Sequence, residues 1–125
     1  VMEGVAYSLR DCMEICREMG INVSDMMACG GGGTSPLWRQ MLADLYACPV
    51  KTSASKEGPA LGVAILAMVG AGLYKSVPEA CAAIIGTDKI QEPVRENIPV
   101  YEKYYRLYTE IYPAVKEKCA KLAKL

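Results

Sequence analysis

Four consecutive glycines, Gly30 to Gly33, limit most strongly what this chain can fold into. They separate a short apolar run, residues 26–29, from an amphipathic segment that opens with Ser35 and Pro36. Glycine adopts backbone dihedral angles closed to other residues and lets a ligand approach the main chain itself. Where such a turn leads into a helix, free N–H groups and the positive end of the helix dipole converge and favour an anion. The run therefore predicts a strand, a tight turn and a helix start that offers a place for the phosphate of a nucleotide.

The composition predicts one globular domain and argues against several classes of partner. With 125 residues the chain is long enough for one packed core and too short for two. Apolar residues make up 52% and charged residues 22%, which is typical of a globular protein rather than a disordered one. Lys plus Arg equals Asp plus Glu at 14 each, so no excess charge indicates nucleic acid or an anionic membrane as a partner.

The six cysteines lie within apolar periodic segments rather than in loops. This pattern predicts reduced thiols that serve as small core residues in a cytoplasmic protein. Cys12 and Cys16 are four residues apart, on one face of a predicted helix, where they could hold a metal. The chain has no histidine and no second close cysteine pair, so we expect no metal site.

The first half of the chain alternates between helical and strand patterns. Residues 3–19 predict a helix that ends at Gly20, with a buried stripe of Val5, Leu9, Cys12, Cys16 and Met19. Residues 26–29 are typical of a buried strand. Ser35 as N-cap and Pro36 at the first helical position then begin a helix that reaches about Ala47.

The second half predicts one more strand and two further helices before the tail. Residues 49–52 indicate a short strand, and the uncharged segment 59–74 predicts a core helix that is buried. A membrane span needs about 20 such residues and clearer flanks. Ser76 and Glu79 form a capping-box pattern for a short helix to about Ile85. We expect residues 86–99, a proline-bearing stretch, to cross the surface without regular structure.

The tail predicts a long helix that Pro113 kinks or restarts. One face of it carries a stripe of apolar and aromatic side chains: Tyr101, Tyr104, Tyr108, Ile111, Val115 and Leu122. Tyrosines at helical spacing favour a packing face with hydroxyls at its rim. Two alternatives stay open at this point, a base-stacking surface and a surface that docks a partner helix or a second copy.

The order of elements predicts a helix-rich α/β layer with few parallel strands. Two strands are too few for a stable sheet. We therefore expect the other strands to come from chain outside these residues. The start at Val1, already inside a helical pattern, leads us to expect a piece of a longer protein.

Three nucleotide-binding motifs can be compared with the glycine run. A P-loop requires a lysine directly after its last glycine, and the first lysine after this run is Lys51. The dinucleotide fingerprint G-x-G-x-x-G fits at Gly30 and Gly32 but meets Ser35 at its third glycine. The third motif is the strand–Gly-Gly–helix turn that holds the adenosine and inner phosphate of ATP in sugar kinases and actin-like ATPases. The P-loop is thus excluded and the dinucleotide match is weak, and the third motif is the one to compare further with the sequence.

Residues 29–44, which contain the glycine run, resemble the glycine-rich signature near the C-terminus of the FGGY carbohydrate kinases. Residues 3–11 are similar to the helix that precedes the signature, and residues 57–64 to the Glu-and-Ala-Leu-Gly segment that follows it. The resemblance covers roughly residues 1–85, and the tyrosine-rich tail is also similar. Within the family, residues 35–40 together with 57–60 most resemble the members that act on xylulose.

The resemblance implies phosphoryl transfer from ATP to a sugar hydroxyl, in a cleft between two actin-like (ribonuclease H-like) domains. This chain would be the C-terminal part of the second domain, with residues 1–85 as an α/β portion, residues 29–35 as its nucleotide loop and residues 86–125 as a helical tail. The nucleotide-binding residues carried over by position are Gly30, Gly31, Gly32 and Ser35. Ser35 either contacts the nucleotide or only caps the helix. We expect Trp38 to be a packing aromatic and Arg39 a surface cation.

The family's catalytic aspartate, sugar-contacting residues and second phosphate-binding turn lie upstream of the matching stretch. We therefore expect no catalytic residue in this chain, no kinase activity from it alone, and Mg²⁺ held mainly by residues outside it. The partners implied are a sugar, ATP, the rest of the kinase chain and a second copy of the full-length protein, without nucleic acid or membrane. Xylulose is the expected sugar, and gluconate, glycerol, ribulose and rhamnulose remain alternatives. A regulatory ATPase without a sugar substrate and a non-enzymatic interaction module are the other classes left open.

Overall fold

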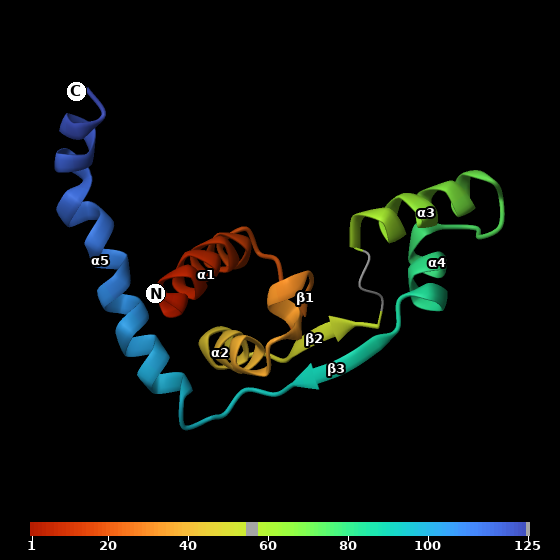
Figure 1. Cartoon of the computed structure of the whole chain (residues 1–125), viewed down its shortest axis with the longest axis horizontal. Coiled ribbons are helices and arrows are strands. Elements are labelled where there is room, and N and C mark those ends of the chain that lie inside the picture. Colours follow the sequence, from red (N-terminus) through yellow and green to blue (C-terminus); the bar gives the residue numbers. More distant parts are fainter. Residues whose placement is uncertain (55–57, 125) are drawn as a thin grey trace.

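The computed structural model describes residues 1–54 and 58–124 (Figure 1). Glu57, part of the predicted 57–64 segment, lies outside the described residues. The elements follow one another as α1 (Met2–Glu18), β1 (Met26–Ala28), the 3-10 turn η1 (Gly31–Thr34), α2 (Pro36–Tyr46), β2 (Val50–Ser53), α3 (Gly58–Gly70), α4 (Val77–Ile84), β3 (Thr87–Gln91) and α5 (Ile98–Leu122). This is the helix-rich α/β arrangement that the sequence predicts.

The described strands form one sheet in the order β1-β2-β3. β1 pairs with β2 in parallel, with Met26 opposite Val50, and β3 pairs with β2 antiparallel. The predicted strands at 26–29 and 49–52 are confirmed in position, but β1 is not buried as predicted, since Met27 is 44% exposed. The expectation of irregular chain across 86–99 was wrong at β3. The residues of β3 are almost all exposed and polar, so they carry no alternation of buried and exposed positions that would identify a strand.

A hydrophobic core fills the space between α1, α2, β2 and the first half of α5. Its most deeply buried members include Ala6, Ala43, Leu45 and Val50. Tyr46 belongs to the same core, and burial raises the pKa of its hydroxyl to about 12. Figure 1 shows α1, α2 and α5 toward one end of the molecule, α3 and α4 at the other, and β2 and β3 running between them.

Helix α1 buries a different face from the predicted stripe. Ala6, Tyr7 and Met13 are its buried residues, whereas Leu9 is 44% and Met19 is 72% exposed. The stripe was wrong because α1 packs against both α2 and α5, and this rotates its contact face toward Tyr7. The predicted end of the helix is confirmed. Gly20 adopts φ +80°, and the N–H groups of residues 20 and 21 donate to the carbonyls of residues 17 and 16.

Helix α3 has the predicted position but not the predicted burial. Ile65 is its only buried residue among those described, and Val63 and Leu66 are more than half exposed. A helix that is apolar on all faces is stable when other elements pack on several of those faces. Within the described chain only α4 packs closely on α3, so its other faces remain exposed. None of the helices in residues 1–54 and 58–124 combines the length and the hydropathy that crossing a membrane requires.

Helix α4 begins at the predicted N-cap, Ser76, but its Glu79 carboxylate accepts from the residue before the N-cap and not from the N-cap itself, so the predicted capping box forms only in part. The Ser76 hydroxyl accepts a hydrogen bond from the Glu79 N–H, and the Glu79 carboxylate accepts one from the N–H of Lys75. Helix α5 runs unbroken through Pro113, so the predicted restart of the helix is wrong. Its second half extends beyond the other elements in Figure 1.

Tyrosines join α1 to α5. The ring centroid of Tyr7 lies 5.4 Å from that of Tyr108 and 6.2 Å from that of Tyr105. The guanidinium carbon of Arg10 lies 4.1 Å from the centre of the Tyr105 ring, and the Tyr105 hydroxyl donates to Asp11 at 2.6 Å. The expected packing role is therefore confirmed for Tyr108, whereas Tyr104 of the same stripe is exposed.

Asp44 ties α2 to the segment between β3 and α5. This carboxylate is 2% exposed and accepts hydrogen bonds from the side chain of Gln40, the N–H of Val94 and the side chain of Asn97, at 2.6 to 2.7 Å. Gln40 also donates to the carbonyl of Glu92. The chain between sheet and tail is held to α2, the helix that follows the glycine turn.

Candidate functional site

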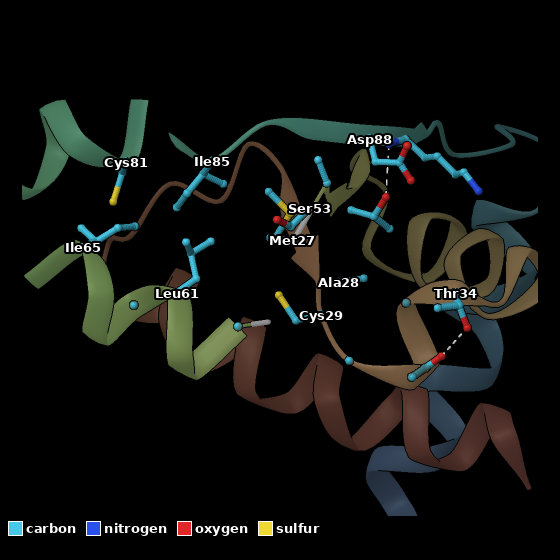
Figure 2. Close-up of a pocket in the computed structure, with 18 of the residues that line it drawn as sticks. Met27, Ala28, Cys29, Thr34, Ser53, Leu61, Ile65, Cys81, Ile85 and Asp88 are labelled. Carbon is cyan, nitrogen blue, oxygen red and sulfur yellow. Dashed lines mark hydrogen bonds between the residues drawn. The ribbon is translucent and has the colours of Figure 1, made fainter. Parts of the chain in front are cut away.

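The glycine run forms a compact turn at the carboxyl end of β1. Gly30 adopts φ +73° and ψ −168°, a backbone conformation that is open essentially only to glycine. The next four residues make the 3-10 turn η1, in which the Thr34 hydroxyl donates to the Gly31 carbonyl at 2.7 Å (Figure 2). The predicted succession of strand, tight turn and helix is confirmed.

A side chain at each of the other three glycines would meet different surroundings. A Cβ on Gly33 would lie 2.9 Å from the carbonyl oxygen of Ala28, closer than real Cβ contacts come. A Cβ on Gly32 would lie 3.2 Å from the indole nitrogen of Trp38. A Cβ on Gly31 would meet nothing within 4 Å. Gly32 and Gly33 therefore make room for packing, and Gly31 leaves space open above the turn.

Ser35 and Pro36 start α2 as the sequence predicts. The Ser35 hydroxyl accepts a hydrogen bond from the N–H of Trp38 at 3.3 Å, which satisfies one of the free donors at the start of the helix. Trp38 packs partly buried against the core, in agreement with its expected role. The N-terminus of α2 thus follows directly on the glycine turn.

Arg39 is not the surface cation that we expected. Its side chain is 5% exposed, and one guanidinium nitrogen, Nη1, donates to the carbonyl of Gly33 at 2.6 Å. A helix position one turn after the N-cap gives no indication of burial by itself. Here η1 packs against α2, and the Gly33 carbonyl of η1 accepts the hydrogen bond from the guanidinium.

A cavity of about 760 Å³ opens between the glycine turn and the helices α3 and α4. This volume lies in the range of pockets that bind cofactors and nucleotides. Figure 2 shows Leu61 and Ile65 of α3 on one side of the cavity, opposite Cys81 and Ile85. Cys29, which follows β1, lines another side. The lining is mostly apolar, and its polar side chains come from the glycine turn, α2, β2 and β3.

The structure brings two of the four predicted nucleotide-binding residues to this cavity. Gly30 and Gly31 line it. Gly32 and Ser35 are not among the described residues that line it, because Gly32 faces Trp38 and the Ser35 hydroxyl is engaged as the N-cap.

Sequence reasoning missed the polar residues that other strands bring to the cavity. Thr52 and Ser53 lie at the carboxyl end of β2, next to the end of β1. Ligands of parallel sheets bind outside the carboxyl ends of strands, so the predicted strand 49–52 did offer this signal. Asp88 and Lys89 come from β3, which the sequence pattern did not reveal.

No group of three or more acidic, cysteine or histidine side chains that could hold a metal ion occurs in residues 1–54 and 58–124. The described residues that line the cavity include three with charged side chains, Arg39, Asp88 and Lys89. Two are cationic and one is anionic. The charge of the lining therefore favours an anionic ligand.

Fold and site together define a class: an α/β domain in which a strand, a glycine turn and a helix N-terminus face a nucleotide-sized cavity at the carboxyl end of the sheet. The model of the C-terminal domain of the FGGY family of carbohydrate kinases matches residues 1–71. The chain belongs to the FGGY family of carbohydrate kinases.

The curated relatives include kinases of more than one sugar. The xylulose kinase of Staphylococcus epidermidis is 38% identical over 122 residues, which are 98% of this chain and 25% of that protein. The xylulose kinase of Bacillus subtilis is 33% identical over 94% of this chain and 23% of its own length. The ribulokinase of Mycolicibacterium smegmatis is 34% identical over 90% of this chain and 20% of its own length.

Solved structures show the same likeness. A ligand-bound xylulose kinase from Lactobacillus acidophilus matches with a TM-score of 0.86 at 25% identity, over 98% of this chain and 25% of that chain. A gluconate kinase from the same organism matches with a TM-score of 0.83 at 26% identity, over 92% of this chain and 23% of its own. The chain thus spans about a quarter of the length of these relatives.

Proposed function

We propose that this chain is the C-terminal part of the second actin-like domain of a carbohydrate kinase, which transfers a phosphoryl group from ATP to a sugar hydroxyl. The observation that carries the proposal is the cavity between Gly30 and Gly31 on one side and α3 and α4 on the other. Membership of the FGGY family supports phosphoryl transfer as the reaction. In the proposal, residues 1–85 carry the nucleotide loop 29–35, and residues 86–125 form the C-terminal tail.

In the proposal, the nucleotide lies in the cavity in one orientation. Its adenosine would lie against apolar side chains such as Leu61, Ile65 and Ile85, and its inner phosphate would lie at Gly30 and Gly31. The space above Gly31 would admit the phosphate, and the α2 dipole would stabilise its charge. Gly32 and Ser35 would hold the turn and the helix start in place, and Ser35 reaches the nucleotide only if its capping hydrogen bond opens.

The chemical step also needs a metal on the phosphates and a base that orients the sugar hydroxyl. In the proposal, Mg²⁺ arrives on ATP and is held mainly by residues outside this chain, as are the base and the sugar. Xylulose, converted to xylulose 5-phosphate, is the first candidate because xylulose kinases are prominent among the relatives. The likeness to ribulokinases and a gluconate kinase supports the coarser statement of a sugar kinase.

The proposed setting is the cytoplasm, with a homodimer of the full-length kinase. All six cysteines lie in the described part of the chain and are free thiols, as a reducing compartment favours. Only Cys48 of the six is buried, so the predicted role as core residues was wrong for the exposed Cys12, Cys29 and Cys119. The exposed apolar side chains of α5, among them Tyr104, Leu107 and Ile111, offer a surface for the rest of the kinase or for a second copy.

A chimera tests the proposal. In it these 125 residues replace the corresponding quarter of the Staphylococcus epidermidis xylulose kinase. We expect the chimera to release ADP in the presence of xylulose, and the amide NMR signals of Gly30 and Gly31 in the chain alone to shift when ADP is added. Normal folding of the chain without any shift of these signals at saturating ADP would contradict the proposed nucleotide site.

A further inference from the structure

The buried guanidinium of Arg39 is incompletely satisfied. Nη1 donates to the Gly33 carbonyl, but Nε is closed off from solvent and has no hydrogen-bond partner. A guanidinium has five N–H donors and no acceptor, so a single carbonyl leaves most of its capacity unused. Among the described side chains it is the one whose buried nitrogen has no partner.

The charge of Arg39 has no counter-ion either. Within residues 1–54 and 58–124, Arg39 forms no ion pair with a carboxylate. Asp44, on the same helix, accepts its hydrogen bonds from Gln40, Val94 and Asn97 instead. An unpaired buried charge is strongly unfavourable, so the arrangement calls for an anionic acceptor that these residues do not supply.

Arg39 lines the same cavity as Gly30 and Gly31. Its guanidinium holds the carbonyl of Gly33, whose backbone in turn packs against Ala28 at the end of β1. An oxyanion that settles beside the turn would therefore meet both the free backbone N–H groups and an uncompensated cation.

We propose that Arg39 is an oxyanion-binding residue of this cavity, which fixes the glycine turn through Gly33 and gives N–H groups of its terminal guanidinium nitrogens to a phosphate oxygen of the nucleotide, with Nε–H reporting the change in the charge of the group. The inference rests on the proposed nucleotide site and adds a cationic residue to it. A carboxylate from the rest of a longer protein has the same chemistry. The shared cavity with Gly30 and Gly31 favours the phosphate, because the same ligand then satisfies the turn and the guanidinium.

NMR of the unmodified chain tests the inference, and a variant is used only to assign the signal. The Nε–H signal of Arg39 is assigned by its loss in Arg39→Lys and followed during titrations with ADP and with adenosine. We expect it to shift with ADP and not with adenosine, while the amides of Gly30 and Gly31 report binding of the nucleotide. Shifts of the glycine amides without a shift of Arg39 Nε–H would overturn the inference, leave the nucleotide site intact and assign the missing acceptor to a carboxylate. If the glycine amides also stay unchanged at saturating ADP, the proposed function itself fails.

Two variants separate a direct contact from a general effect of charge. Arg39→Met should lower the preference for ADP over adenosine by more than about tenfold, as expected for a lost charge-assisted hydrogen bond. Lys89→Met removes an exposed cation of the same lining and should lower the preference only about twofold. Equal losses in the two variants would show a non-specific effect of charge and contradict the inference. Equal weakening of ADP and adenosine in Arg39→Met would reduce Arg39 to a residue that positions the turn.

Discussion

Four adjacent residues of one type have four different physical roles in the turn. Gly30 is required by its dihedral angles, Gly33 by the approach of its Cα to the carbonyl of Ala28, and Gly32 by the indole of Trp38. A Cβ at Gly30 or at Gly31 would meet open space, and of these two only Gly31 has a backbone conformation that other residues can adopt. A substitution at Gly31 therefore tests binding, and one at Gly33 tests folding.

Gly31→Val in the chimera should raise the KM for ATP by at least about tenfold, a loss of about 1.4 kcal/mol, because the new side chain takes the space of the nucleotide. The KM for xylulose should change little. Steady-state kinetics with each substrate varied in turn measures both constants. An unchanged KM for ATP would remove Gly31 from the nucleotide site.

The matched control is Gly33→Ala, which should act on stability. Its methyl group would lie 2.9 Å from a backbone oxygen that cannot move away, and such overpacking costs about 1–3 kcal/mol. Urea denaturation of the chain with Gly33→Ala and with Gly31→Val should therefore show the larger loss for Gly33→Ala.

At the scale of elements, a few polar contacts decide how helices meet. Asp44 attaches α2 to the chain before α5, and the pair of Arg10 and Glu102 attaches α1 to α5 with an N–O distance of 2.6 Å. The periodicity of apolar residues predicted that these helices exist. It gave the wrong face for α1, because a helix that touches two neighbours is oriented by both, and the sequence pattern does not contain the neighbours' positions.

Asp44→Ala should lower the free energy of unfolding by about 3 kcal/mol or more, because three buried or partly buried donors lose a charged acceptor. Urea denaturation measures the change. Asp25→Ala is a suitable control, since Asp25 makes a partly exposed ion pair with Lys51 and should contribute less than about 1 kcal/mol. Equal effects of the two substitutions would contradict the role assigned to Asp44.

The contact between Arg10 and Glu102 predicts that the stability of the fold falls at acidic pH. The hydrogen bond from Arg10 is the largest of the effects that hold the pKa of Glu102 below its ordinary value of 4.5. A carboxyl whose pKa is lower in the folded state stabilises the fold above the unfolded-state pKa, and this contribution is lost as the pH falls through the folded-state pKa. Thermal unfolding of the chain should therefore show less acid destabilisation in Glu102→Gln than in the wild type. Identical acid sensitivity would rule out this contribution.

At the scale of the whole molecule, much apolar surface has no cover within the described residues. The glycine turn, α3 and α4 enclose the cavity on some sides only, and apolar side chains of α3 and α5 remain exposed. The chain spans about a quarter of the length of its relatives. In the proposed kinase, residues outside this chain would pack on α3, which would explain why this apolar helix lies on the surface here.

The purified chain should therefore show no sugar-dependent release of ADP from ATP. The expected reason is that the base, the sugar-binding residues and most metal ligands lie outside it. A coupled ADP assay with xylulose measures this, with the chimera as the positive control. Activity of the chain alone above the background without sugar would overturn the proposed division of the site.

Local sequence patterns account for the structure around the glycine turn: a strand before it, Ser35 as the N-cap after it, and helix starts at Pro36 and near Ser76. These features depend on dihedral freedom, capping and short-range periodicity, which neighbouring residues decide. Tertiary structure alone decided that β3 joins the sheet, that α1 turns Tyr7 inward, and that Arg39 is buried under the turn. Each of these depends on contacts between segments far apart in the chain or on how a turn folds over a helix, and no local pattern encodes such contacts.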